Sequence, residues 1–445
     1  MNRLFADHAL LPAGFAERVM LSWDDSGALN AVHSGAACPS DVPRAAGLVV
    51  PGLPNLHSHA FQRAFAGLTE YRASAHDSFW SWRDRMYRFA GAITPDDLEA
   101  IATQLYIEML RAGYTSVCEF HYVHHDPAGR PYADAAAMSL RLVAAARRAG
   151  IGLTMLPVLY QASGFGAKPP REDQKRFLND VEGLLRIVEA LRANGVRTGV
   201  APHSLRAVPP PALAELLAGL DAIDATAPIH IHIAEQMQEV RDSIAHSGAR
   251  PLQWLLDHAP VDPRWCLVHA THLDDPEREG AARCGAVIGL CPTTEANLGD
   301  GLFDLPAWQG PWGIGSDSHA SVDAGEELRL LEYGQRLARQ QRNVMVAEDL
   351  WRCAVAGGAQ AAGRKVAGLA VGQQADLIVL ADAMFEGLTP AQQLASHLFA
   401  SHRRDAVAQV WVAGRCVIDN GRHAAAEAAE RGFVAARARL LEALR

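Results

Sequence analysis

The 445-residue sequence lacks long apolar runs and an export signal. No stretch approaches the roughly 20 consecutive apolar residues that a membrane-spanning helix needs. The first residues do not form the apolar segment of a secretory leader either. We therefore expect a cytoplasmic protein with no part in the membrane.

Paired cysteine motifs and basic clusters are missing as well. The seven cysteines are scattered along the chain, their number is odd, and no Cys-x-x-Cys pair occurs. This usage predicts reduced thiols and excludes a disulfide framework or a zinc ribbon. With a net charge of −9 and no basic patch, the sequence argues against nucleic acid as a partner. It still allows a small anionic substrate, because a few local arginines can bind one.

The sequence does contain a regular alternation of strands and helices from about residue 50 onward. Apolar residues make up 49% and charged residues 20%, as in a globular protein large enough to bury a sizeable core. We expect eight strands, which end near residues 57, 120, 160, 201, 234, 268, 290 and 315. Eight strands alternating with helices predict an α/β fold, a (β/α)8 TIM barrel over residues 50–365.

The two ends of the chain show a different pattern. Residues 1–49 and 366–423 consist of short apolar runs separated by turn signals, such as Asp25-Ser26-Gly27. Neither segment has enough residues for a core of its own. We therefore predict that they form one small β-sandwich domain beside the barrel, followed by a C-terminal helix over residues 424–445.

Three segments between the strands carry local signals. Residues 60–93 predict a polar and aromatic loop, which contains Trp80. Thr94-Pro95-Asp96-Asp97 predicts the start of a helix, because a hydroxyl cap, a proline and acidic residues favour the first turn. The Gly- and Pro-rich residues 163–170 form a stretch long enough to act as a lid.

Polar side chains occur where the predicted strands end. His57 and His59 are two residues apart, so the alternation along a strand places both on one face. His232 and Asp317 follow the ends of two other strands. Active sites of (β/α)8 barrels lie at the carboxyl ends of the strands, and three His with one Asp is an ordinary set of zinc ligands. The sequence predicts a metal site there, with one position left for water.

Two more strand-end residues suit proton transfer. Glu235 can accept a proton from water and pass it on, although an exposed acid at a helix start is the alternative interpretation. His269 is either a fourth imidazole ligand or a hydrogen-bond partner of the attacking water. We expect His230 to be structural and His319 to be a neighbour of the ligands. A second metal would need a bridging carboxylate, often a modified Lys on the fourth strand, but residues 197–203 contain no Lys, so we expect a single ion.

These motifs resemble the amidohydrolase superfamily over nearly the whole chain. The resemblance rests on Pro51-Gly52 followed by His57-Ser58-His59, on His232 with Glu235, on the lone His269 and on Ser316-Asp317. Within the superfamily, residues 55–63, 78–83, 119–125 and 202–206 are similar to the iminohydrolases that act on N-formimino-L-glutamate in bacterial histidine degradation.

The resemblance implies one zinc ion per chain and a role for each site residue. Zinc is expected on His57, His59, His232 and Asp317, with Glu235 as the acid and base, and His269 and Asp317 assisting catalysis. The substrate is expected to be held by Gln62, Arg83, Tyr122, His203 and Arg206. Two arginines suit a dicarboxylate, since a guanidinium binds carboxylate in a planar, bidentate manner. The implied reaction converts N-formimino-L-glutamate and water into N-formyl-L-glutamate and ammonia, in an enzyme that is often a homodimer.

Two other functions stay open at this point. A related deaminase would act on a purine or adenosine derivative, such as guanine or S-adenosylhomocysteine, but its pocket would need stacking aromatic rings more than two arginines. A non-catalytic barrel with a binding role is the second alternative. Such a protein would be expected to have lost ligands, and none of the proposed ligands is missing here.

Overall fold

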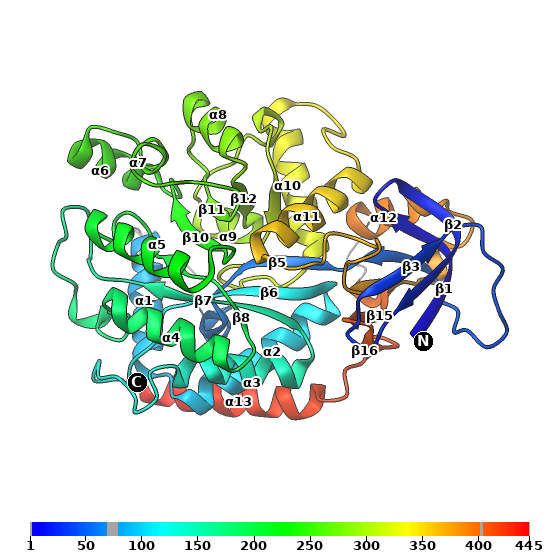
Figure 1. Ribbon diagram of the computed structural model, residues 1–445, viewed down its shortest axis with the longest axis horizontal. Coiled ribbons are helices and arrows are strands. Elements are labelled where there is room, and N and C mark those ends of the chain that lie inside the picture. Colours follow the sequence, from blue (N-terminus) through cyan, green and yellow to red (C-terminus); the bar gives the residue numbers. More distant parts are fainter. Residues whose placement is uncertain (1, 69–78, 401–403, 445) are drawn as a thin grey trace.

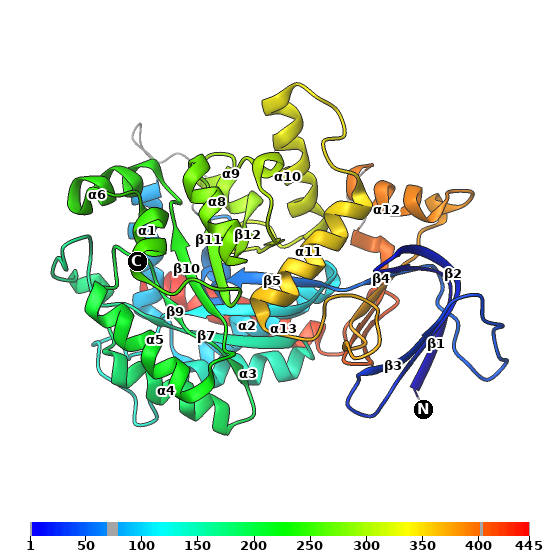
Figure 2. The same ribbon diagram turned by 45° about the horizontal axis from the view of Figure 1, so that its top comes forward.

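The computed structural model describes residues 2–68, 79–400 and 404–444. In this part of the chain, one seven-stranded sheet lies beside two parallel sheets, and helices surround the parallel sheets (Figure 1, Figure 2). The strands are β1 (Asn2–Leu11), β2 (Gly14–Trp23), β3 (Leu29–His33), β4 (Leu48–Pro51), β5 (Leu53–Ser58), β6 (Tyr114–His121), β7 (Gly152–Leu159), β8 (Arg197–Thr198), β9 (Ala201–Pro202), β10 (Ile229–Ile233), β11 (Trp265–His269), β12 (Val287–Leu290), β13 (Trp312–Ile314), β14 (Leu377–Leu380), β15 (Val407–Val412) and β16 (Arg415–Asp419). The α-helices are α1 (Phe79–Ala92), α2 (Pro95–Arg111), α3 (Ala137–Ala149), α4 (Val181–Ala193), α5 (Pro210–Asp224), α6 (Met237–Ser247), α7 (Pro251–His258), α8 (Asp275–Cys284), α9 (Pro292–Leu298), α10 (Ala324–Arg339), α11 (Ala347–Ala362), α12 (Pro390–Phe399) and α13 (Ala426–Ala443).

The two parallel sheets contain the strands predicted from the alternating pattern. One sheet has the order β5-β6-β7-β8, with β9 paired to β7, and the other has the order β10-β11-β12-β13. Single parallel bridges join their ends, between Val200 and Ile229 and between Ser58 and Asp317. The residues of β5, β6, β7 and β10 are all buried, as expected for parallel strands covered on both faces. The predicted α/β class is therefore confirmed, whereas closure into one barrel stays a prediction.

The fourth predicted strand is the one that differs. The chain forms β8 and β9 as two short pieces, and Gly199 lies between them. A Cβ atom at Gly199 would lie 2.1 Å from the carbonyl oxygen of Pro228, so only glycine allows the two segments to approach so closely.

The seven-stranded sheet combines both ends of the chain in the order β16-β15-β14-β4-β1-β2-β3. Its seam is the antiparallel pair β4 and β14, in which Pro51 lies opposite Leu377. The turn at Gly27 packs on the hairpin of β15 and β16, since a Cβ there would lie 2.2 Å from the carbonyl oxygen of Ala413. Only Gly52 separates β4 from β5, which connects this sheet directly to the strand of His57. The seven described strands belong to one connected sheet, and a two-layer sandwich stays a prediction.

The helix expected after Thr94 is present as α2. Thr94 Oγ1 accepts a hydrogen bond from the amide of Asp97, and the Asp97 carboxylate accepts one from the amide of Thr94. Helix α13 falls within the range predicted for the C-terminal helix and lies along α2 (Figure 1). Arg439 of α13 donates from Nε to Asp97 Oδ1 at 3.1 Å, so the same buried carboxylate caps α2 and fixes the last helix.

The loop predicted over residues 60–93 was wrong for residues 60–65 and 79–92, while residues 69–78 lie outside the part of the chain that the structure describes. The chain forms the 3₁₀ helix η1 (Ala60–Phe65) and then α1. Met86, Phe89 and Ala90 of α1 are buried at helical spacing. Residue 78 lies outside the described residues. None of the described helices is both long and apolar enough to cross a membrane. Residues 163–170 fold back on themselves through a hydrogen bond from Ser163 Oγ to Pro169 O, and their role as a lid stays a prediction.

Candidate active site

Four side chains from three strand ends converge at one point of the parallel sheets. His57 lies in β5 and His59 directly follows this strand, His232 lies near the end of β10, and Asp317 follows β13. The Nε2 atom of His57 lies 3.1 Å from Nε2 of His59 and 3.0 Å from Nε2 of His232. Asp317 Oδ1 lies 3.3 Å and 3.2 Å from the Nε2 atoms of His57 and His59. All four residues are buried, and the structure thus brings the predicted metal ligands together.

The hydrogen bonds of the imidazoles indicate a site for a cation. His59 Nδ1 lies 2.9 Å from the carbonyl oxygen of Phe120, and His232 Nδ1 lies 3.1 Å from that of His203. Since a carbonyl only accepts, each Nδ1 carries the hydrogen and each Nε2 presents a lone pair to the centre. Lone pairs this close repel unless a cation lies among them. Their separations match those between two ligands bound at about 2.0–2.1 Å to a tetrahedral zinc ion, so the residues fit zinc.

The backbone around these ligands is held tightly. Asn55 donates from Nδ2 to Ser316 Oγ at 2.6 Å, and its Oδ1 accepts from the amides of Ser316 and His57 at 3.1 Å and 3.3 Å. A Cβ atom at Gly315 would lie 2.8–2.9 Å from three atoms of His57, so β13 can approach β5 only with glycine there. Asp317 has a φ of +44°, a left-handed conformation that is uncommon for a residue other than glycine and that clusters at functional sites.

His269 lies between the metal ligands and a group of carboxylates. Its Nε2 atom is 3.7 Å from Glu235 Oε1 and 3.9 Å from Asp317 Oδ2, while its Nδ1 atom is 3.3 Å from Glu295 Oε1. Burial by itself lowers the pKa of His269, but the three carboxylates outweigh burial and raise the pKa to about 10. His269 also has a left-handed backbone, with a φ of +66°. This geometry suits a positively charged residue that attracts the carboxylates of Glu235 and Asp317.

A cavity of about 60 Å³ lies over the cluster. Its wall contains every predicted site residue except His57, which is buried beneath it: His59, Gln62, Arg83, Tyr122, His203, Arg206, His232, Glu235, His269 and Asp317. Trp82, Met86 and Tyr87 of α1 form part of the same wall. The predicted metal-binding, proton-transfer and substrate-binding residues therefore share one cavity.

Three of the wall residues offer neutral hydrogen-bonding groups. Gln62 donates from Nε2 to the hydroxyl of Tyr122 at 3.0 Å. Burial raises the pKa of Tyr122 well above its usual value. Burial, together with the charge of Arg206, lowers the pKa of His203 well below its usual value. Near neutral pH, Tyr122 and His203 are therefore uncharged, as expected for groups that bind the polar middle of a substrate.

The two arginines in the wall supply positive charge. Arg83 comes from α1, and its guanidinium carbon lies 5.6 Å from the centre of the Tyr87 ring. Arg206 follows β9, and its Nη2 atom lies 4.0 Å from Glu235 Oε2. Burial by itself lowers the pKa of Arg206, but Glu239 and Glu235 outweigh burial and raise it. Both guanidinium groups stay charged, which makes the cavity suitable for an anion.

Comparison with known proteins places this site in a family. The sequence model of the amidohydrolase family matches residues 48–417. The chain belongs to the amidohydrolase family. A relative named formimidoylglutamate deiminase, from Pseudomonas aeruginosa, is 51% identical over 460 residues, which cover 99% of this chain and 100% of that protein.

Solved structures of amidohydrolases agree with the fold. The crystal structure of an amidohydrolase from Brucella melitensis has a TM-score of 0.94 and 45% identity, and the match covers 99% of this chain and 100% of that chain. An adenosine deaminase from Xanthomonas campestris, solved with bound zinc, has a TM-score of 0.81 at 23% identity and covers 99% of this chain and 98% of its own. At that identity, the second structure shows a shared fold alone.

The amidohydrolase site contains supporting residues to which sequence reasoning assigned no role. Glu119 accepts hydrogen bonds from Ser58 Oγ at 2.7 Å and from the amide of Ala60 at 2.6 Å, so it holds the segment that carries His57 and His59. Burial raises the pKa of Glu119 to about 7, although these hydrogen bonds by themselves lower it. Glu295 contacts His269, as described above. Both acids lie at or just after the end of a strand, which is the signal that could have revealed them.

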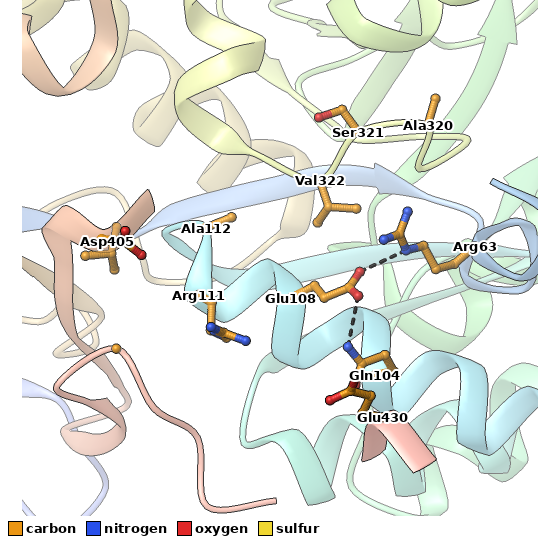
Figure 3. Close-up of a pocket in the computed structure, with 12 residues that line it drawn as sticks. Arg63, Gln104, Glu108, Arg111, Ala112, Ala320, Ser321, Val322, Asp405 and Glu430 are labelled. Atoms are coloured by element: carbon orange, nitrogen blue, oxygen red, sulfur yellow. Dashed lines mark hydrogen bonds and ion pairs between the residues drawn. The ribbon is translucent and has the colours of Figure 1, made fainter. Parts of the chain in front are cut away.

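A second, roomier cavity of about 500 Å³ shares no lining residue with the amidohydrolase site (Figure 3). It is lined by parts of α2, β15, α13 and the loop after β13, and Arg63 of η1 reaches into it. Its polar groups pair with one another: Arg63 Nε lies 2.8 Å from Glu108 Oε2, and Gln104 donates to Glu108 Oε1 at 2.9 Å. None of the potential metal-binding groups found among the described residues includes one of its lining residues. This cavity is therefore a poor candidate for the catalytic chemistry.

Proposed function

We propose that this amidohydrolase hydrolyses N-formimino-L-glutamate to N-formyl-L-glutamate and ammonia in histidine degradation. The observation that carries the proposal is the combination of a metal-ligand cluster and two charged arginines in the wall of one cavity. The identity of 51% over 99% of the chain to a formimidoylglutamate deiminase supports it. The substrate has two carboxylates, and the two arginines offer one bidentate partner for each.

We infer that one zinc ion per chain is held by His57, His59, His232 and Asp317. The Nε2 lone pairs of His59 and His232, which lie 3.1 Å and 3.0 Å from His57 Nε2, support a cation there. When bound, zinc lowers the pKa of a coordinated water to about 7. The fourth predicted strand, residues 197–203, has no Lys to supply a bridging group, which favours a single ion.

The side chains around the ion divide the proton transfers between them. Asp317 keeps Oδ2 directed toward His269 Nε2, 3.9 Å away, so that His269 can orient the attacking water while Asp317 accepts its proton. Water adds to the formimino carbon, and the carbon–nitrogen double bond becomes a single bond. Glu235, 3.7 Å from His269, then takes the proton of the newly added hydroxyl and delivers it to the nitrogen, so that ammonia leaves as the new carbonyl forms and Asp317 returns its proton to the solvent. An already protonated formimino group needs no further activation for this attack.

Substrate orientation follows from the wall of the cavity. Arg83 approaches from α1 and Arg206 from the loop after β9, so the two guanidinium groups come from different elements. Each is proposed to bind one carboxylate in a bidentate manner. Gln62, Tyr122 and His203, as neutral groups, would bind the chain between the carboxylates. Closing the cavity around the substrate would exclude bulk water and strengthen these charge-assisted hydrogen bonds.

We propose that the parallel sheets form one (β/α)8 barrel over residues 50–365 and that residues 1–49 and 366–423 complete a small sandwich beside it. The bridges from Val200 to Ile229 and from Ser58 to Asp317 support barrel closure, because they join both ends of the two sheets. We also propose a cytoplasmic homodimer, as the resemblance implies. Light scattering coupled to size-exclusion chromatography tests the dimer.

A deaminase of a purine or adenosine derivative is the alternative. A relative named 5-methylthioadenosine/S-adenosylhomocysteine deaminase, from Natronomonas pharaonis, supports it, being 28% identical over 90% of this chain. Ammonia release by the zinc-loaded protein should be measured with N-formimino-L-glutamate, guanine and S-adenosylhomocysteine at equal concentrations. The proposal predicts turnover of the first compound and little of the others. Faster turnover of either ring compound would establish the alternative.

A further inference from the structure

The ring of His269 is held from behind by Glu295, a buried residue of α9 that no proposed step uses. Glu295 Oε1 accepts a hydrogen bond from the amide of Cys291 at 2.8 Å, and the same oxygen lies 3.3 Å from His269 Nδ1. Because the Cys291 amide belongs to the start of α9, it fixes the direction in which the carboxylate faces the ring. The carboxylate is 6% exposed, so water competes little for this contact.

This contact determines which face of His269 meets the substrate. A carboxylate only accepts, so Nδ1 carries the hydrogen and Nε2 is left to face the cavity. Nε2 then lies 3.7 Å from Glu235 Oε1 and 3.9 Å from Asp317 Oδ2. Carboxylates commonly fix the tautomer and the orientation of a functional histidine in this way.

We propose that Glu295 is a positioning residue, which acts on the reaction by holding the ring orientation of His269. Without it, the His269 ring could rotate, and this change would disturb its contacts with Glu235 and Asp317. The inference rests on the proposed function only through the substrate chosen to test it.

The competing interpretation is that Glu295 merely caps α9. The start of α9 offers a matched control, because a second buried glutamate accepts hydrogen bonds from a residue in its first turn. Glu327 accepts from the amide and the hydroxyl of Thr293 at 2.9 Å and 2.6 Å, and these hydrogen bonds do not involve His269. If capping were the whole role, neutralising Glu295 and neutralising Glu327 should have similar consequences.

The test compares zinc-loaded Glu295→Met, Glu295→Gln and Glu327→Gln with the parent, using N-formimino-L-glutamate. We expect Glu295→Met to lower kcat about 10- to 100-fold, the usual cost of losing such an orienting partner. The KM, the zinc content and the melting temperature of this variant should change little. Glu295→Gln keeps an acceptor oxygen and should fall between Glu295→Met and the parent. Glu327→Gln should keep the kcat of the parent.

A double-mutant cycle separates positioning from a general structural effect. In a His269→Asn background, Glu295→Met should change kcat by less than about twofold, because its effect passes through His269. The same loss in both backgrounds, equal losses in Glu295→Gln and Glu327→Gln, or a Glu295→Met variant as active as the parent would overturn the proposal. If the parent fails on N-formimino-L-glutamate but deaminates guanine or S-adenosylhomocysteine, the proposed function fails, and the same cycle on that substrate still tests Glu295.

Discussion

Replacing Arg83 with Met gives the sharpest test of the dicarboxylate substrate. The Met side chain keeps most of the apolar contact with the cavity wall but removes the charge and the planar fork. Arg83 is a cleaner choice than Arg206, because Arg206 lies 4.0 Å from Glu235 and its loss would also disturb the proposed acid. Arg83 comes from α1 and is not among the proposed metal ligands.

The expected loss follows from the strength of one charge-assisted pair. A carboxylate bound by a guanidinium in a closed cavity is stabilised by roughly 1.5–3 kcal/mol. That free energy corresponds to a decrease of about 10- to 150-fold in kcat/KM. Arg83→Lys keeps the charge but loses the bidentate geometry, so it should recover only part of the loss. Zinc content should equal that of the parent in both variants.

The assay is kcat/KM for N-formimino-L-glutamate, measured together with metal content. Arg88→Met is the matched control: Arg88 lies on the same helix, is exposed, and donates to the carbonyl oxygen of Leu444. It should leave kcat/KM unchanged. Should Arg83→Met and Arg206→Met both hydrolyse the substrate as well as the parent, the dicarboxylate interpretation is wrong and a neutral ring becomes the better candidate.

Three further predictions concern catalysis, metal content and stability. Glu235→Gln should lower kcat by about 10²- to 10⁴-fold while zinc and substrate still bind, because only proton transfer is removed; near-normal kcat would eliminate Glu235 from the mechanism. Metal analysis should find about one zinc per chain, with activity lost to a chelator and restored by zinc, and two tightly bound ions per chain would contradict the ligand assignment. Thr94→Ala removes half of the capping box at the start of α2, should cost about 1 kcal/mol of unfolding free energy and should lower the melting temperature by about 1 °C without changing kcat. An unchanged melting temperature would show that the cap contributes little.

The course of the strands could be predicted because burial on both faces makes parallel strands read as short apolar runs. The sequence pattern does not predict the path of the backbone where close packing between distant segments determines it. The strand expected over residues 197–201 is interrupted at Gly199, and the interruption follows from the nearby carbonyl of Pro228, a contact between segments that no local pattern contains. Helix α1 was different, since Met86, Phe89 and Ala90 do repeat at helical spacing. Its tryptophans and arginines give the segment the composition of a loop, although its apolar residues have helical periodicity.

The residues that would bind metal and the residues that orient them differ in how far sequence can reveal them. A ligand is recognisable by its side-chain chemistry and by its place at a strand end, and these two properties suffice because parallel strands all end on the same side of the sheets. An orienting residue is defined by its partner instead. Asn55 matters because its amide meets Ser316, 261 positions later, and Glu295 because its carboxylate meets His269 from the far side of the ring. Asparagine and glutamate at such positions have many ordinary uses, among them turns and helix caps, so their types do not distinguish them. The ligand set of a new amidohydrolase can therefore be proposed from its sequence, whereas the hydrogen bonds that hold those residues in place are recognised only in a structure.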